Sequence, residues 1–281
     1  IVVHKGFELP SFVDGGTLVV AISASGNSPE AVTAASAAVE SGARLFAVTS
    51  GGRLGAMADA AAAPTVFLPA SATPIPTRTR IGALSVPVLR AFEDIGLFPG
   101  ARDWIASAVD QLVARRTELT SGDGTGARLA HALQGTIPIV YGGGAAGGVA
   151  AERWKVQLNQ SAKCPAWTGV LPDVVHGGIA GWGQHGDVTR QVMSLVLLRH
   201  DDEPAEMAEQ FERVETWTEE VVTAVHTVRA AGDGALAQIL DLGLQGDWVA
   251  LELADRAGLD PGPTPVILAS PGADAEEPAP T

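Results

Sequence analysis

The sequence predicts an α/β protein with two tandem, doubly wound parallel sheets. In both halves of the chain, short apolar runs bounded by turn residues alternate with helical stretches, a pattern typical of strands buried on both faces. A polar, glycine-rich linker at residues 120–126 separates the halves. We therefore predict a first domain at residues 1–121, a second at 127–268 and an acidic tail at 269–281.

The first half begins with a short predicted strand at residues 1–3, followed by a loop. Ser28 suits the N-cap of the first helix, Pro29 its first position and Gly42 its C-terminal cap. The predicted elements are strands at 18–22, 45–49 and 65–68, and helices at 30–41, 54–62, 79–92 and 101–118.

The second half repeats the alternation. Three glycines, 142–144, separate its first strand from the helix that follows. The tail at 273–281 is acidic and predicted to be disordered. The predicted elements are strands at 137–141 and 192–198, helices at 145–160 and 206–231, and one or two helices within 235–257.

Composition excludes several function classes. The 281 residues include 46% hydrophobic ones, enough for a real core. Because 32 acidic residues face 18 basic ones, for a net charge of -14, we expect no nucleic-acid partner. A single cysteine excludes an internal disulfide and predicts a cytoplasmic protein. The sequence shows no membrane-spanning stretch or signal peptide, so we expect no membrane partner.

The stretch after the strand at 18–22 has the pattern of an anion-binding loop. Ser23, Ser25 and Ser28 offer hydroxyl donors, and the following helix directs free backbone N–H groups and a positive dipole end at the loop. The spacing matches neither a P-loop nor a dinucleotide fingerprint. Spacing alone leaves a phosphate cradle and an ordinary turn equally open.

Longer motifs resemble a known family. Residues 23–30 and 49–54 resemble the phosphosugar-binding loops of SIS (sugar isomerase) domains. Residues 153–163, 176–182 and 246–249 are similar to stretches of bifunctional phosphoglucose/phosphomannose isomerases. The resemblance implies two flavodoxin-like SIS domains, a homodimer, and a sugar-phosphate site between domains and subunits. It also implies that the chain starts late, because the family's first strand and glycine-rich turn have no counterpart here.

The resemblance assigns phosphate anchoring to the first half. Ser23, Ser25 and Ser28 fall on the family's hydroxyl positions. Arg78 matches an arginine that the family places near the reacting sugar, with Arg80 as the alternative register.

The proton carrier of the family is changed. Gln160 stands where the family has a glutamate, and an amide cannot accept a proton at neutral pH. A general base contributes about 10²–10⁴-fold to a rate. Glu152 lies two helical turns earlier, roughly 12 Å away, which is too far for it to substitute.

His176 matches the family's ring-opening histidine, which the resemblance places in the partner subunit's site. Gly177 and Gly178 replace an Asn–Glu pair, so we expect an exposed and mobile imidazole. The alternative is a loop histidine without a partner.

At the C-terminal end, Thr264 remains as a candidate sugar contact, but no lysine occurs after Lys163, so the family's catalytic lysine is missing. Isomerisation of this kind needs no metal or other cofactor, and we expect none. Trp154, Trp167 and Trp182 are predicted to lie in the core or at an interface.

Three hypotheses remain. We favour a phosphosugar-binding SIS protein whose isomerase activity is weak or lost, because the serines are kept while position 160 is an amide. The alternatives are an active isomerase that interconverts fructose 6-phosphate with glucose 6-phosphate or mannose 6-phosphate, and a structural dimerising partner without a ligand.

Overall fold

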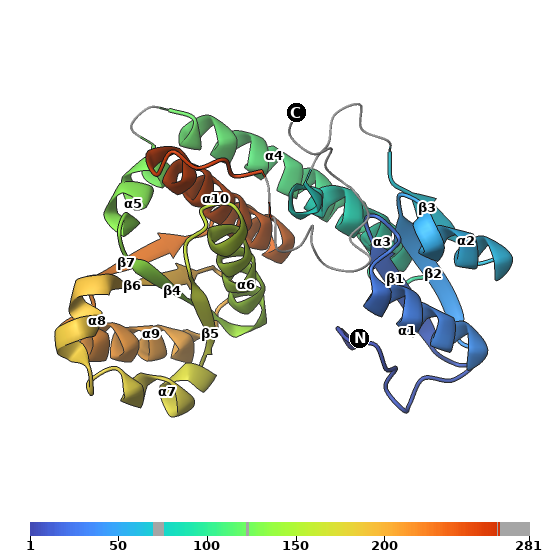
Figure 1. Cartoon of the computed structure of the whole chain (residues 1–281), viewed down its shortest axis with the longest axis horizontal. Helices are drawn as coiled ribbons and strands as arrows, with labels where there is room; N and C mark the ends of the chain where they lie inside the picture. Colours follow the sequence, from blue (N-terminus) through green and yellow to red (C-terminus); the bar gives the residue numbers. More distant parts are fainter. Residues whose placement is uncertain (70–75, 122–123, 263, 265–281) are drawn as a thin grey trace. The chain divides into compact units, whose positions relative to one another are not determined.

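The computed structural model describes residues 1–69, 76–121, 124–262 and 264 (Figure 1). The chain divides into two compact units, the first containing Ile1–Ala101 and the second Arg102–Pro263. Both are α/β units with parallel sheets, as the sequence predicts. The predicted tail at 269–281 lies outside the described residues.

The first unit holds a three-stranded parallel sheet in the order β1-β2-β3. Residues 1–3, predicted as a strand, form none and are exposed, so that prediction is wrong. The elements are β1 (Leu18–Ser23), α1 (Pro29–Glu40), β2 (Arg44–Thr49), α2 (Gly52–Ala60), β3 (Thr65–Phe67), the 3-10 helix η1 (Thr77–Thr79) and α3 (Ile81–Asp94).

Helices cover both faces of this sheet. Successive side chains of a strand point to opposite faces. Leu45 and Ala47 of β2 therefore pack with α1 and α2, whereas Phe46 and Val48 pack with α3. This two-sided burial explains why β2 is a continuous apolar run in the sequence.

The second unit holds a four-stranded parallel sheet in the order β5-β4-β6-β7. The strands are β4 (Ile137–Gly143), β5 (Trp167–Leu171), β6 (Met193–Arg199) and β7 (Ala224–Arg229). The helices are α4 (Ala101–Leu119), α5 (Thr125–Leu133), α6 (Gly144–Gln160), α7 (Asp173–Gly177), η2 (Ile179–Gly181), α8 (Gly186–Val192), α9 (Ala205–Thr218) and α10 (Ala235–Arg256).

The strands of this unit differ from the sequence prediction at two places. The helix predicted at 206–231 ends at Thr218, and the rest of that range contains β7. Residues 221–229 are rich in valine and threonine, whose branched side chains favour a strand. The second difference is strand β5, which the sequence analysis did not predict.

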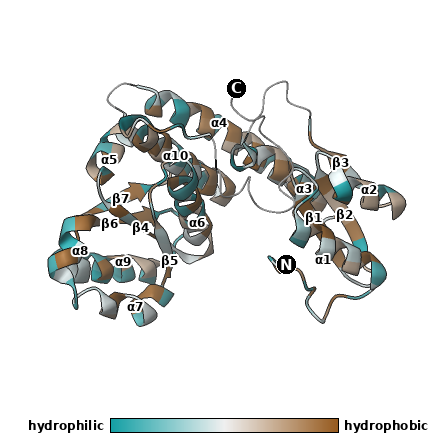
Figure 2. Cartoon of the chain, viewed as in Figure 1, coloured by the Kyte–Doolittle hydropathy of each residue, from teal (hydrophilic) through white to brown (hydrophobic). Residues whose placement is uncertain are grey.

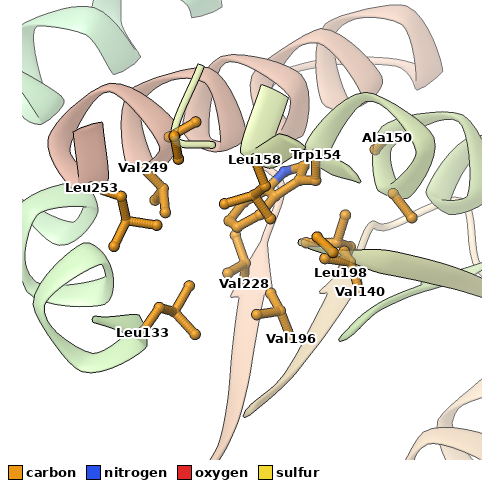
Figure 3. Packing of buried hydrophobic residues seen from close by; sticks show 14 of the residues in the cluster. Leu133, Val140, Ala150, Trp154, Leu158, Val196, Leu198, Val228, Val249 and Leu253 are labelled. Carbon is orange, nitrogen blue, oxygen red and sulfur yellow. The ribbon is translucent and has the colours of Figure 1, made fainter. Parts of the chain in front are cut away.

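The core of the second unit lies on both faces of its sheet. Figure 2 shows hydrophobic residues concentrated in the central strands. Trp154 of α6 is fully buried between the sheet and α10, among Leu158, Val196 and Val228 (Figure 3). On the other face, α9 packs against β4 and β6 through Phe211 and its neighbours.

Within the second unit, a buried carboxylate holds helix α4 to α10. Asp241 of α10 is inaccessible to solvent and accepts hydrogen bonds from Arg115 Nε and Nη2 at 2.8 and 2.9 Å, from Gln111, from Gln245 and from the Ala231 N–H. The hydrogen bond to Asp241 raises the pKa of Arg115, so the guanidinium stays charged. The predicted limit at residue 121 assigns this helix to the first domain; the domain limits stay a prediction.

Candidate functional site

The loop after β1 is organised by its own hydroxyl groups. Ser23, the buried last residue of β1, has its Oγ 3.0 Å from the Oγ of Ser28. The N–H of Gly26 donates to Ser23 Oγ at 3.1 Å, and the N–H of Asn27 donates to Ser25 Oγ at 3.2 Å. The structure therefore brings the hydroxyls of Ser23 and Ser28 into contact, and Ser25, the third serine assigned to phosphate binding, lies in the same loop.

Backbone groups that follow β2 form hydrogen bonds to the loop after β1. The N–H of Leu54 donates to the carbonyl of Gly26 at 2.8 Å, and the N–H of Arg53 donates to Asn27 Oδ1 at 3.0 Å. Gly26 has a φ of 74°, and a Cβ at this position would lie 1.9 Å from the Gly51 carbonyl oxygen. Only glycine fits here, so the loop is held in a fixed shape.

The first turn of α1 faces this loop. Ser28 is its N-cap and Pro29 its first residue, as predicted, but Ser28 makes no side-chain capping bond because its hydroxyl lies against Ser23. A helix N-terminus without such a cap directs backbone N–H groups and a positive dipole end outward. This arrangement suits an anion held among the serines.

The two candidate arginines follow β3. Arg78 is half-buried in η1, and Arg80 Nη1 donates to Ser50 Oγ at 3.4 Å. Because Ser50 begins the loop after β2, this contact places the Arg80 guanidinium at the carboxyl end of that strand. The choice between Arg78 and Arg80 as sugar contact stays a prediction.

The candidate residues of the second unit lie on different elements. Gln160 is the half-buried last residue of α6, and its carbonyl accepts a hydrogen bond from Lys163 Nζ. His176 is exposed on α7. Glu152 pairs with Lys155. Thr264 is half-buried, and its neighbours in the chain, 263 and 265, lie outside the described residues.

The segment around His176 is anchored. Val174, Ile179 and Trp182 are buried in one cluster with Tyr141, and Trp182 Nε1 donates to Tyr141 Oη at 3.2 Å. The prediction of an exposed imidazole is confirmed. The glycine pair, which suggested mobility, lies between buried anchors.

Two other motifs of the sequence analysis hold helices together. Arg153 of α6 pairs with Asp247 of α10, and Trp154 Nε1 donates to the Leu242 carbonyl at 2.7 Å. A Cβ at Gly246 would lie 2.5 Å from the Trp154 ring, so glycine permits the close crossing of the two helices. Burial raises the pKa of Asp247 against the opposing effect of Arg153.

Within the ranges that the structure describes, no three histidine, cysteine or carboxylate side chains are grouped to hold a metal ion. In the same ranges, no helix is long and apolar enough to cross a membrane.

Comparison with known proteins identifies the family. Residues 123–269 match the model of the bacterial phospho-glucose isomerase C-terminal SIS domain. The bifunctional phosphoglucose/phosphomannose isomerase of Caldicellulosiruptor bescii is 30% identical over 271 residues, which cover 95% of this chain and 79% of the relative. The chain belongs to the family of bacterial phosphoglucose/phosphomannose isomerases. The enzyme of the same name from Aquifex aeolicus is 28% identical over 94% of the chain and 78% of its own length.

Solved structures agree on the fold. A glucose-6-phosphate isomerase like protein from Thermus thermophilus superposes with a TM-score of 0.59 and 22% identity, covering 92% of this chain and 87% of its own. Tagatose-6-phosphate ketose/aldose isomerase from Escherichia coli gives a TM-score of 0.65 at 15% identity, with 89% and 72% covered. The family model and the relatives confirm the family resemblance inferred from the motifs, and the solved structures support the fold.

Proposed function

We propose that the chain binds a sugar phosphate, with Ser23, Ser25 and Ser28 and the first turn of α1 anchoring the phosphate. The observation that supports it most is the ordered loop after β1. Ser23 Oγ contacts Ser28 Oγ and accepts from the Gly26 N–H, and Ser25 Oγ accepts from the Asn27 N–H. Membership in a phosphosugar isomerase family supports this assignment.

The same proposal includes an isomerase activity that is weak or lost. Gln160 occupies the position of the expected base, and its amide can bond a sugar hydroxyl but cannot carry a proton between carbons. We assign His176 to ring opening, a step that needs no group at position 160.

A binding experiment tests the anchoring. Glucose 6-phosphate, mannose 6-phosphate and fructose 6-phosphate are each added to the protein while its melting temperature is measured. A ligand at 100 times its Kd adds about 2.7 kcal/mol of stability. Ser28→Ala should reduce the shift because it removes a loop hydroxyl, whereas the control Ser36→Ala, later on α1, should keep it. No shift with any of the three sugars would favour the structural-partner alternative.

An active isomerase is the second candidate, favoured by the names of the relatives. A coupled assay that follows conversion of fructose 6-phosphate to glucose 6-phosphate or mannose 6-phosphate tests it. Turnover at about 1–10³ per second would contradict the hypothesis of a weak or lost activity.

We further propose a homodimer of chains with two tandem SIS domains. Apolar residues at the outer strand β5 and on α6 support an interface near the segment that carries His176. They are Val149, Trp167 and Val170, which are 59%, 54% and 38% exposed. Analytical ultracentrifugation should show a dimer that Trp167→Glu weakens. The control Trp217→Glu, at an exposed position on α9, should leave it intact.

A further inference from the structure

The helix that carries His176 cannot fix its own direction. Helix α7 has five residues, Asp173–Gly177, and isolated helices this short are unstable in water. Gly178 follows directly and leaves the backbone permissive. The orientation of the exposed imidazole therefore depends on contacts that the flanking residues make with the rest of the second unit.

Those contacts centre on Tyr141. Its side chain lies beneath the segment in the cluster that also holds Val174, Ile179 and Trp182. The bond from Trp182 Nε1 to Tyr141 Oη, at 3.2 Å and between two buried side chains, adds direction to this apolar contact. Burial raises the pKa of Tyr141, so the phenol stays neutral.

Gly169 makes the room for this arrangement. It lies directly opposite Tyr141 in the pairing of β4 with β5. A Cβ at Gly169 would lie 2.9 Å from Tyr141 Cε1 and 2.5 Å from Val174 Cγ2. Any side chain here would push apart the tyrosine ring and the helix that carries His176.

We propose that Tyr141, Gly169 and Trp182 are positioning residues for His176, which fix the direction in which its imidazole leaves the surface. What His176 then does rests on the proposed function. The arrangement grips both flanks of the exposed histidine, with Val174 before it and Ile179 and Trp182 after it. Such a grip suits a group that must meet a substrate in one geometry, because small misplacements of reacting groups cost large factors in rate.

Two variants test the proposal. Tyr141→Phe keeps the ring and removes only the hydrogen-bond acceptor, and Gly169→Ala introduces the overlapping methyl group. The matched control is Val222→Ala, which weakens the same apolar cluster elsewhere. Native-state hydrogen exchange of residues 173–182 and the NMR chemical shifts of the His176 imidazole report position without any ligand. Exchange of glucose 6-phosphate anomers, followed by NMR, reports ring opening.

We expect both variants to speed exchange across 173–182 by roughly fivefold or more and to move the NMR chemical shifts of the His176 ring, because a hydrogen bond or a packing contact that closes the segment is lost. Val222→Ala should lower the melting temperature without either effect. Anomer exchange should fall in the two variants and not in the control.

Unchanged local exchange and unchanged His176 chemical shifts in both variants would overturn the positioning role. If the wild-type protein exchanges no anomers while the local measurements respond as expected, the ring-opening assignment fails and the positioning role stands.

Discussion

Strands β1 and β4 are each the first strand of their unit and each leads into a helix, but the two connections are built differently. In the first unit, serine hydroxyls and backbone N–H groups line the loop. In the second, a Cβ at Gly142 would lie 2.0 Å from the Gly147 carbonyl oxygen, and one at Gly143 would lie 2.9 Å from Phe211. His200 Nε2 also donates to the Gly143 carbonyl at 3.0 Å.

The difference shows that the connection from a strand to the next helix can have two roles: the proposed ligand binding in one unit and internal packing in the other. The glycines at the end of β4 let the protein's own backbone and side chains pack closely against this connection, whereas Gly26 shapes a loop that carries the serine hydroxyls and leads into the first turn of α1. We therefore expect the phosphate to bind the first unit, while the second contributes His176 from a different part of its sheet.

We expect the largest effect from a substitution that disrupts the loop after β1. Gly26→Ala should abolish phosphosugar binding, because its methyl group would overlap the Gly51 carbonyl. Gly42→Ala is the matched control, since Gly42 also has a positive φ, 77°, but no atom within 4 Å of the added methyl. It should cost only about 1 kcal/mol of stability and keep binding. Calorimetric titration with glucose 6-phosphate measures both, and equal affinities would contradict the comparison.

The next effect concerns the second unit. Gln160→Glu should raise isomerase activity by about 10²–10⁴-fold, because a carboxylate restores a general base at the end of α6. Asn159→Glu, at the adjacent exposed position, adds the same charge and should give no gain. The coupled assay decides; equal rates for Gln160→Glu and the wild type would show that more than the base is missing.

A third prediction concerns the ion pair between Arg115 of α4 and Asp241 of α10. Arg115→Met should lower the free energy of unfolding by about 3–5 kcal/mol, because it leaves the buried Asp241 without its cation. Arg116→Met, at an exposed position on the same helix, should change it by less than about 0.5 kcal/mol. Denaturant unfolding followed by circular dichroism compares the two; similar losses would argue against a special role for the buried pair.

The smallest effect is a dependence on pH. Burial lowers the pKa of His226 in β7, and its Nε2 is buried without a partner among the described residues. The unfolded chain therefore binds this proton more readily, so stability is lost as the pH falls below the ordinary value of 6.5 towards the lowered one. His226→Phe should reduce that loss. His4→Phe, at an exposed position, should not, and parallel curves for wild type and His226→Phe would contradict the expectation.

Local patterns were sufficient for most of the first unit. Strand β2 and helix α1 follow from an apolar run and from Ser28, Pro29 and Gly42, whose roles depend on neighbours in the chain. The same reasoning failed for β7, where an acidic helical start at 206 masked the branched residues that follow. It also missed β5, an outer strand whose half-exposed residues lack a continuous apolar pattern.

The sequence by itself determined the alternating α/β plan and the family, and it singled out the three serines to which we assign phosphate binding, because these depend on residue type and short spacing. Only the tertiary structure decided that Gly26 interlocks with Gly51, that Asp241 holds α4, and that Tyr141 and Gly169 lie under the segment of His176. Such contacts join residues far apart in the chain, and they form only when the sheets bring their strands into register.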